Sequence, residues 1–188
     1  MIIGLTGGIG TGKSFIANIL HSNGYAHFDC DKVVHQWYDG PGIDEIKKIL
    51  PEAIVDGKVN KLIVRDHLTD DTFLSILEVL TTKWVIDNLN KAINKERYTG
   101  RDIILDVPLL FEFGFNQYCD KVIVVTCPKF LQLQRVAKRD NRSIRELKLL
   151  MTRQMSTYDK ERKADIVIHS GLGKARTYKE LKMSSLIP

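Results

Sequence analysis

The stretch GLTGGIGTGKSFIANIL (residues 4–20) decides the fold. It places three glycines within four positions, then Gly12-Lys13-Ser14, and then an apolar run with helical spacing. Glycine is less stable than alanine inside regular structure by roughly 0.5–1 kcal/mol. A cluster of glycines is therefore tolerated where the backbone takes unusual angles or where another group approaches it closely.

Size and composition indicate a globular chain. The 188 residues are 44% hydrophobic and 27% charged, which suits one domain with its own core and excludes a disordered or collagen-like chain. No apolar run approaches the ~20 residues of a membrane span, and the first residues lack the pattern of a secretory signal. Three cysteines without a CxxC pair fit a reducing compartment. We therefore expect a cytoplasmic monomer without membrane contacts.

Apolar runs alternate with helix-periodic segments along most of the chain. We expect helices at 13–22, 31–38 and 129–139. We expect strands at 1–6, 25–29, 102–107, 121–127 and 164–169. This alternation predicts an α/β fold with a five-stranded, mostly parallel sheet flanked by helices.

Two helical segments interrupt the alternation. Residues 60–97 show helical spacing of Phe73, Leu77, Leu80 and Trp84, and residues 143–163 are helical and basic. We interpret the first as an insertion that binds a substrate and the second as a lid. The chain is then one domain with a core at 1–56, 98–139 and 164–188, an insertion at about 57–97 and a lid at about 140–163.

The glycine cluster fits the phosphate-loop pattern G-x-x-x-x-G-K-[ST] over residues 7–14. An apolar strand precedes it and an amphipathic helix follows, as such a loop requires. Its backbone N–H groups are expected to cradle phosphate oxygens at the positive end of the helix dipole. Lys13 would reach the β- and γ-phosphates, and Ser14 would supply a hydroxyl to Mg²⁺. The alternative, a glycine-rich turn without a ligand, is disfavoured by this context.

A small-molecule kinase is the reaction class that remains. The chain has no guanine-reading N-K-x-D, and an ATPase motor is usually longer. Asp29 and Asp31 follow the second strand, at the sheet edge where open α/β sheets bind ligands. A carboxylate there would orient an acceptor hydroxyl and take its proton. Alternatively, it would cap the helix at 31–38.

Basic residues are concentrated between 128 and 163, a segment that contains eleven lysines and arginines and four acidic residues. Arg135 and Arg139 share one helix face, and planar guanidinium groups suit a transferring phosphoryl group. The alternative is a solvated helix face. A lid at 140–163 would exclude water from ATP. Asp106 ends the strand at 102–107, where it would reach Mg²⁺ through water or cap the next turn.

Several segments resemble those of the bacterial dephospho-coenzyme A kinases over nearly the whole chain. They are IGLTGGIGTGKS (3–14), FDCDKVVHQ (28–36), LDVPLLFEFG (105–114), DKVIVVTCP (120–128), QLQRVAKRDNRS (132–143), RQMSTYDKERKAD (153–165) and IVIHSGLG (166–173). The resemblance implies a P-loop kinase fold. It also implies transfer of the ATP γ-phosphoryl group to the ribose 3′-hydroxyl of dephospho-CoA, the last step of CoA synthesis.

Site residues follow from the same resemblance. Asp31 looks like the catalytic base, Arg139 like a lid arginine that faces the nucleotide, and the backbone at 169–173 like the adenine edge. Phe15 stands where the family usually has threonine. With the loop residues, the expected nucleotide contacts are Gly8, Gly10, Thr11, Gly12, Lys13, Ser14, Phe15, Arg135, Arg139, His169 and Gly171.

Two other functions remain as alternatives. A nucleoside or deoxynucleoside monophosphate kinase needs further arginines in its insertion, and residues 60–97 hold only Arg65 and Arg97. A nucleic-acid-binding protein would use the basic 128–163 segment, which lacks an aromatic stacking platform. We therefore expect ATP with Mg²⁺ and dephospho-CoA as partners, and no nucleic acid.

Overall fold

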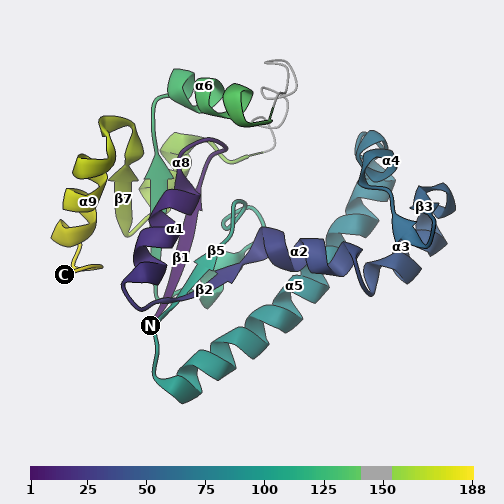
Figure 1. Cartoon of the computed structure of the whole chain (residues 1–188), viewed down its shortest axis with the longest axis horizontal. Helices are drawn as coiled ribbons and strands as arrows, with labels where there is room; N and C mark the ends of the chain where they lie inside the picture. Colours follow the sequence, from purple (N-terminus) through teal and green to yellow (C-terminus); the bar gives the residue numbers. More distant parts are fainter. Residues whose placement is uncertain (141–153) are drawn as a thin grey trace. The chain divides into compact units, whose positions relative to one another are not determined.

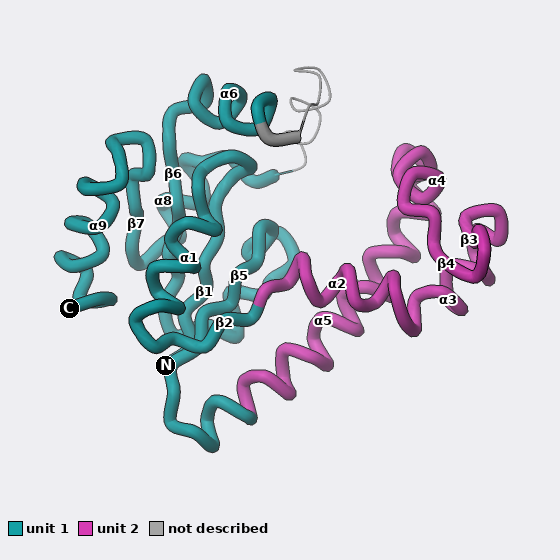
Figure 2. The backbone as a smooth tube through the Cα atoms, viewed as in Figure 1, with its two compact units in different colours: residues 1–28, 95–188 teal, residues 29–94 magenta. Residues whose placement is uncertain are grey.

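The computed structural model describes residues 1–138 and 154–188 with their side chains, and residues 139 and 140 as backbone within a helix. The described chain forms two compact units, which Figure 2 shows in two colours. The first unit comprises residues 1–28 and 95–188, and the second comprises residues 29–94.

A five-stranded sheet occupies the first unit (Figure 1). Its strands lie in the order β2-β5-β1-β6-β7. Their bounds are β1 (Ile2–Gly7), β2 (Ala26–Asp29), β5 (Ile103–Asp106), β6 (Lys121–Thr126) and β7 (Ile166–His169). The pairs β1–β5, β1–β6 and β6–β7 are parallel. Every residue of the central β1 is buried, and its side chains are apolar except that of Thr6. The expected sheet is confirmed.

Helices cover the sheet of the first unit and connect its strands. They are α1 (Lys13–Ser22), α6 (Lys129–Asp140), α8 (Thr157–Lys163) and α9 (Lys174–Met183), with the short 3₁₀ helices η2 (Phe115–Tyr118) and η3 (Ser170–Leu172). Helix α1 buries Ile16, Ala17, Ile19 and Leu20 in one core with Ile3 and other strand residues. This apolar stripe at helical spacing fixes α1 against the sheet directly after the glycine cluster.

The second unit is mostly helical. It contains α2 (Cys30–Tyr38), α3 (Gly42–Ile49), η1 (Pro51–Ala53), the short strands β3 (Ile54–Val55) and β4 (Lys58–Val59), and α4 (Lys61–Asp66). Helix α5 (Asp71–Thr99) begins in this unit and ends in the first. The core of the second unit includes Trp37, Ile46, Leu50, Phe73 and Leu77.

The boundary of the second unit differs from that of the predicted insertion. Residues 29–56 group with the second unit, because Trp37 of α2 and Ile46 of α3 pack with Phe73 and Leu77 of α5. The β3–β4 hairpin turns at Asp56 and Gly57, both with positive φ, and its two-residue strands are too short to show a periodicity.

The predicted lid at 140–163 falls mostly outside the described residues, which include only α8 and its approach. None of the helices in the described ranges 1–140 and 154–188 is both long and apolar enough to cross a bilayer.

Candidate active site

The glycine cluster forms a tight loop between β1 and α1. Gly10 and Gly12 have φ of 76° and 89°, a left-handed conformation that L side chains rarely adopt. A Cβ at Gly10 would lie 2.7 Å from both the backbone oxygen of Gln132 and a methyl of Val136. Residues 7–14 are called the phosphate loop here. Its Gly10 is required both for the backbone angle and for close packing against α6.

Arg135 and Ser170 bind backbone carbonyls of the phosphate loop. The Arg135 guanidinium donates to the carbonyl oxygens of Gly10 and Thr11, each at 3.3 Å, and to the Ser170 hydroxyl at 3.2 Å. The Ser170 hydroxyl in turn donates to the Thr11 carbonyl oxygen. Because Arg135 and Ser170 satisfy these carbonyls, they stabilise the conformation of the loop.

Lys13 and Asp106 form an ion pair beside the loop. The Lys13 ammonium binds one carboxylate oxygen of Asp106, and His27 Nε2 lies 3.3 Å from the other. Both members of the ion pair are largely buried. A charged group removed from water requires such partners, and a phosphate that enters the loop would offer Lys13 a second anion at the same place.

The environment of Asp106 favours its charged form. Burial by itself would raise the pKa of Asp106, but the hydrogen bond with His27 and the charge of Lys13 outweigh it, so the pKa lies below its ordinary value. The side chain is therefore a carboxylate at neutral pH.

The donor set at the loop fits a hard cation. Ser14 lies exposed in the first turn of α1, and the Asp106 carboxylate lies beside Lys13. Among the described residues, no three His, Cys, Asp or Glu side chains gather into a metal cluster. Magnesium is usually held by one or two protein oxygens together with substrate phosphates and water, so these residues suit Mg²⁺ that arrives with a nucleotide.

The aspartate pair lies where β2 meets α2. Asp29 caps α2, because its carboxylate accepts a hydrogen bond of 3.0 Å from the Lys32 backbone N–H. The capping alternative therefore holds for Asp29. Asp31 follows in the first turn of α2, exposed, and belongs to the second unit. Its role as a base remains a prediction.

The predicted adenine edge consists of the end of β7 and η3. The His169 backbone N–H donates to Glu180 at 2.7 Å, and the His169 side chain is exposed. Gly171 packs so closely that a Cβ there would lie 2.7 Å from Pro128. The Phe15 ring packs edge-on against Tyr178 of α9, with 6.2 Å between ring centroids. Contacts of this edge with adenine remain a prediction.

The side chain of Arg135 is described by the structure, and that of Arg139 is not. The described hydrogen bonds of Arg135 go to the loop, to Ser170 and to the Cys127 sulfur, so a direct contact with nucleotide remains a prediction. Arg139 belongs to α6, but its side chain lies outside the described residues.

Several residues around the loop escaped sequence reasoning. His27, Gln132 and Ser170 carry no motif on their own, and the hydroxyl of Ser170 reaches Thr11 across 159 positions of sequence. Gln154 Oε1 accepts a hydrogen bond of 3.2 Å from the Ile9 backbone N–H. The signal available for Gln132, Gln154 and Ser170 was that they belong to the family-like segments at 132–143, 153–165 and 166–173.

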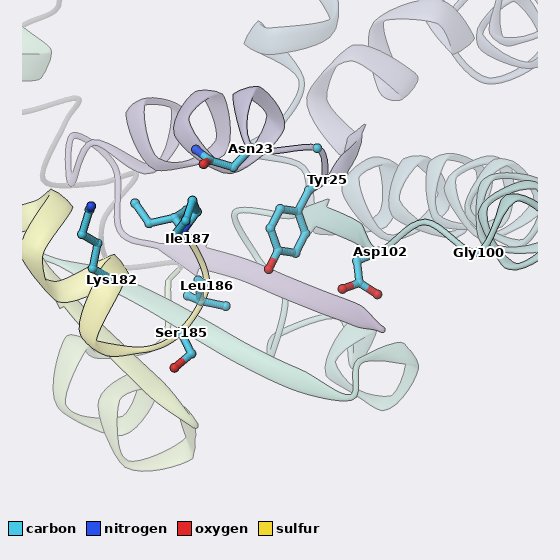
Figure 3. A pocket seen from close by; sticks show the side chains of 10 residues that line it. Asn23, Tyr25, Gly100, Asp102, Lys182, Ser185, Leu186 and Ile187 are labelled. Atoms are coloured by element: carbon cyan, nitrogen blue, oxygen red, sulfur yellow. The ribbon is translucent and has the colours of Figure 1, made fainter.

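Two cavities flank the sheet of the first unit. One, of about 500 Å³, borders the phosphate loop at Gly8 and is also lined by Gln132, Gln154 and Lys160. The other, of about 550 Å³, lies at the opposite edge, where Tyr25 and Asp102 precede β2 and β5 (Figure 3). Because parallel strands direct their carboxyl ends to one edge, only the first cavity adjoins the candidate site.

Comparisons with known proteins identify the family of the chain. The sequence model of the dephospho-CoA kinase family matches residues 1–174. A dephospho-CoA kinase of Wolbachia sp. subsp. Brugia malayi is 36% identical over 186 residues, with 97% of this chain and 95% of the relative covered.

Solved structures also match. A Thermus thermophilus protein, TT1252, has a TM-score of 0.89 at 28% identity, with 99% of this chain and 96% of the other covered. The dephospho-CoA kinase from Campylobacter jejuni has a TM-score of 0.74 at 24% identity over 98% of this chain and 95% of its own, and it shows the shared fold. The chain belongs to the dephospho-CoA kinase family.

Proposed function

We propose that this chain transfers the γ-phosphoryl group of ATP to the ribose 3′-hydroxyl of dephospho-CoA and so forms CoA. Family membership supports the reaction. The observation that carries it in the structure is the Lys13 ammonium, held on Asp106 at the start of a helix whose preceding loop is shaped by Gly10 and Gly12. Such a loop supplies N–H donors, a helix dipole and a mobile cation to the same anion.

The proposed chemistry needs one base and several cations. The 3′-oxygen forms a bond to the γ-phosphorus while the bond from that phosphorus to the ADP oxygen breaks. The hydroxyl proton passes to the Asp31 carboxylate, which follows Asp29 at the end of β2. Lys13 leaves Asp106 for the β- and γ-phosphates, where it stabilises the charge of the transferring group.

Magnesium completes the proposed site. Ser14 would hold the ion directly and Asp106 would hold it through water, and the ion would neutralise charge on the phosphate oxygens. Once Lys13 has moved to the phosphates, the Asp106 carboxylate keeps its hydrogen bond with His27.

The two arginines of α6 take different roles in this proposal. Arg135 serves the nucleotide through the loop, because its described donors bind Gly10, Thr11 and Ser170. Arg139 lies one helical turn further and would contact the nucleotide phosphates directly. The backbone at 169–173 would border the adenine, next to Ser170, which already contacts the loop.

The acceptor assignment is tested by a coupled assay for ADP release. Purified protein with ATP and Mg²⁺ is offered dephospho-CoA or a panel of nucleoside monophosphates. We expect turnover with dephospho-CoA to exceed that with every monophosphate by at least tenfold. A strong preference for one monophosphate would instead assign the chain to nucleoside monophosphate kinases and leave the phosphate-loop assignment intact.

We also propose that the enzyme acts as a cytoplasmic monomer without nucleic acid. No disulfide joins the described cysteines, and Cys119 and Cys127 are free thiols, as a reducing compartment favours. Sedimentation at micromolar concentration should give a mass near 21.4 kDa. A stable dimer, or a complex with DNA at moderate salt, would contradict this part of the proposal.

A further inference from the structure

A chain of contacts connects the phosphate loop with the 154–160 segment. This segment includes the first four residues of α8, and it lines the cavity at Gly8. At its start, Gln154 accepts the Ile9 backbone N–H at 3.2 Å. A Cβ at Gly8 would lie 3.6 Å from that same Gln154 oxygen and 3.1 Å from the side-chain oxygen of Gln132. Two carboxamides therefore flank the first turn of the loop.

The hydrogen bond from Ile9 sets the direction of one peptide. Nucleotide binding in such a loop depends on N–H groups that point at phosphate oxygens. Because Gln154 engages the Ile9 N–H, the peptide between Gly8 and Ile9 is held from outside the loop. Errors of about 1 Å in positioning are enough to cost 10²-fold in rate.

A buried ion pair fixes Gln154 in turn. The backbone N–H of Met155 donates to Glu112 Oε1 at 2.7 Å, and the Lys160 ammonium lies 3.0 Å from the same oxygen. Lys160 also donates to the Pro108 carbonyl oxygen at 3.2 Å, which accepts the Thr6 hydroxyl of β1 as well. The 154–160 segment is thus attached to β1 and to the loop after β5.

This ion pair is a costly way to gain stability alone. The Lys160 side chain is 2% exposed and that of Glu112 is 17% exposed. Glu112 Oε2 is buried without a hydrogen-bond partner among the described residues. Desolvation of a buried pair often cancels its attraction, and an apolar replacement is then as stable. The pair is therefore weak evidence for stability, whereas its Glu112 carboxylate also binds the backbone of Met155, the neighbour of Gln154.

We propose that Gln154 is a positioning residue for phosphoryl transfer, and that the Glu112–Lys160 pair acts on the phosphate loop through it. The inference rests on the proposed function in one respect, namely that the loop holds the ATP phosphates. It concerns the Ile9 peptide only, since Arg135 and Ser170 bind the carbonyls of Gly10 and Thr11.

The first test replaces Gln154 by methionine, which keeps the length of the side chain and removes the acceptor. We expect KM for ATP to rise about fivefold or more and kcat/KM for ATP to fall 10- to 100-fold, while KM for dephospho-CoA stays within twofold. The exposed Gln134 of α6 supplies the matched control Gln134→Met. A variant that only lowers the folded fraction would reduce kcat and leave KM for ATP unchanged, which would overturn the proposal.

The second test is a double-mutant cycle with Lys160→Met. If the ion pair acts through Gln154, the double variant should lose no more kcat/KM for ATP than the more impaired single variant. Losses that multiply would contradict this route. Lys163→Met, an exposed lysine on the same helix, is the control for removing a charge. Should Lys160→Met fail to fold, the result for Gln154→Met alone decides.

Calorimetric ATP binding, measured without acceptor, separates this inference from the proposed function. If wild-type protein binds ATP but does not phosphorylate dephospho-CoA, the acceptor assignment fails, and Gln154→Met is still judged by its dissociation constant for ATP. An unchanged dissociation constant together with an unchanged KM for ATP would overturn the role of Gln154.

Discussion

The two units of this protein bury different kinds of side chain. The first unit contains all nine buried polar or charged residues of the described chain: Thr6, Thr11, Glu96, Asp106, Thr126, Gln132, Lys160, Ser170 and Thr177. In the second unit, which is described throughout, every buried residue is apolar. The polar residues therefore concentrate in the unit that holds the phosphate loop.

The difference shows where the molecule needs a fixed geometry. Buried polar groups require partners, and a satisfied network has few alternative arrangements. Asp106 and Ser170 bind directly to the phosphate loop in this way. The second unit has an apolar core and carries Asp31 on an exposed helical turn. Substitutions of the buried polar residues in the first unit should therefore weaken the binding or use of ATP. Substitutions in the second unit should affect either the acceptor step or stability alone.

The largest expected effect belongs to the ammonium of Lys13. Lys13→Met removes the cation that the account assigns to the transferring phosphoryl group, and turnover should fall about 10³-fold. The exposed Lys179 of α9 provides the control Lys179→Met, which should retain wild-type turnover. Turnover of Lys13→Met within tenfold of wild type, measured by ADP release, would remove Lys13 from the chemistry.

The next effect separates the acceptor step from nucleotide binding. Asp31→Asn should lower kcat about 10²-fold, because an amide does not accept the hydroxyl proton. Its dissociation constant for ATP should stay within twofold. Asp44→Asn, also in the first turn of a helix of the second unit, should behave like wild type. Loss of ATP binding in Asp31→Asn would show that the residue serves the nucleotide instead.

A substitution that creates a cavity in the second unit tests whether its apolar core serves stability alone. Leu77 is buried beside Phe73, so Leu77→Ala should lower the free energy of unfolding by about 2–5 kcal/mol. ATP affinity should not change, since the loop lies in the other unit. Leu62→Ala, at a side chain 60% exposed, should change stability by less than about 0.5 kcal/mol. Denaturant unfolding and calorimetry measure both quantities, and weakened ATP binding by folded Leu77→Ala would contradict the division.

The smallest effect is a pH dependence of stability. The folded pKa of Asp106 lies below its unfolded value of about 3.9, because His27 and Lys13 outweigh the effect of burial. Its contribution is present above pH ~4 and is lost as pH falls through the folded pKa. The unfolding free energy of wild type should therefore drop more steeply below pH ~4 than that of Asp106→Asn. Parallel curves would contradict the described pairing of Asp106.

The sheet and the loop could be predicted because their signals are local. The strands β1, β5 and β6 are mostly apolar, and all their residues except Lys121 are buried. The spacing from Gly7 to Ser14 is a contiguous motif. The strand order places their carboxyl ends at the loop, as parallel α/β sheets do.

The remaining features depend on contacts between distant positions. The hydrogen bond between Ile9 and Gln154 joins residues 145 positions apart, and that between Lys160 and Pro108 joins residues 52 positions apart. The periodicity of the sequence predicts neither contact. Helices α2 and α3 are amphipathic, but an apolar face does not show which core it joins, and they join α5 instead of the sheet. Arg135 illustrates the same gap, because a helix face predicts its direction but not its partners Gly10 and Ser170.

We propose above all that the phosphate loop binds ATP and that the Lys13 ammonium moves to its phosphates. A crystal structure with Mg²⁺ and a non-hydrolysable ATP analogue tests it most directly. We expect phosphate oxygens within hydrogen-bond distance of the backbone N–H groups at residues 10–14, with the Lys13 ammonium moved from Asp106 to the terminal phosphates. An analogue bound away from this loop, or bound while Lys13 stays on Asp106, would contradict it.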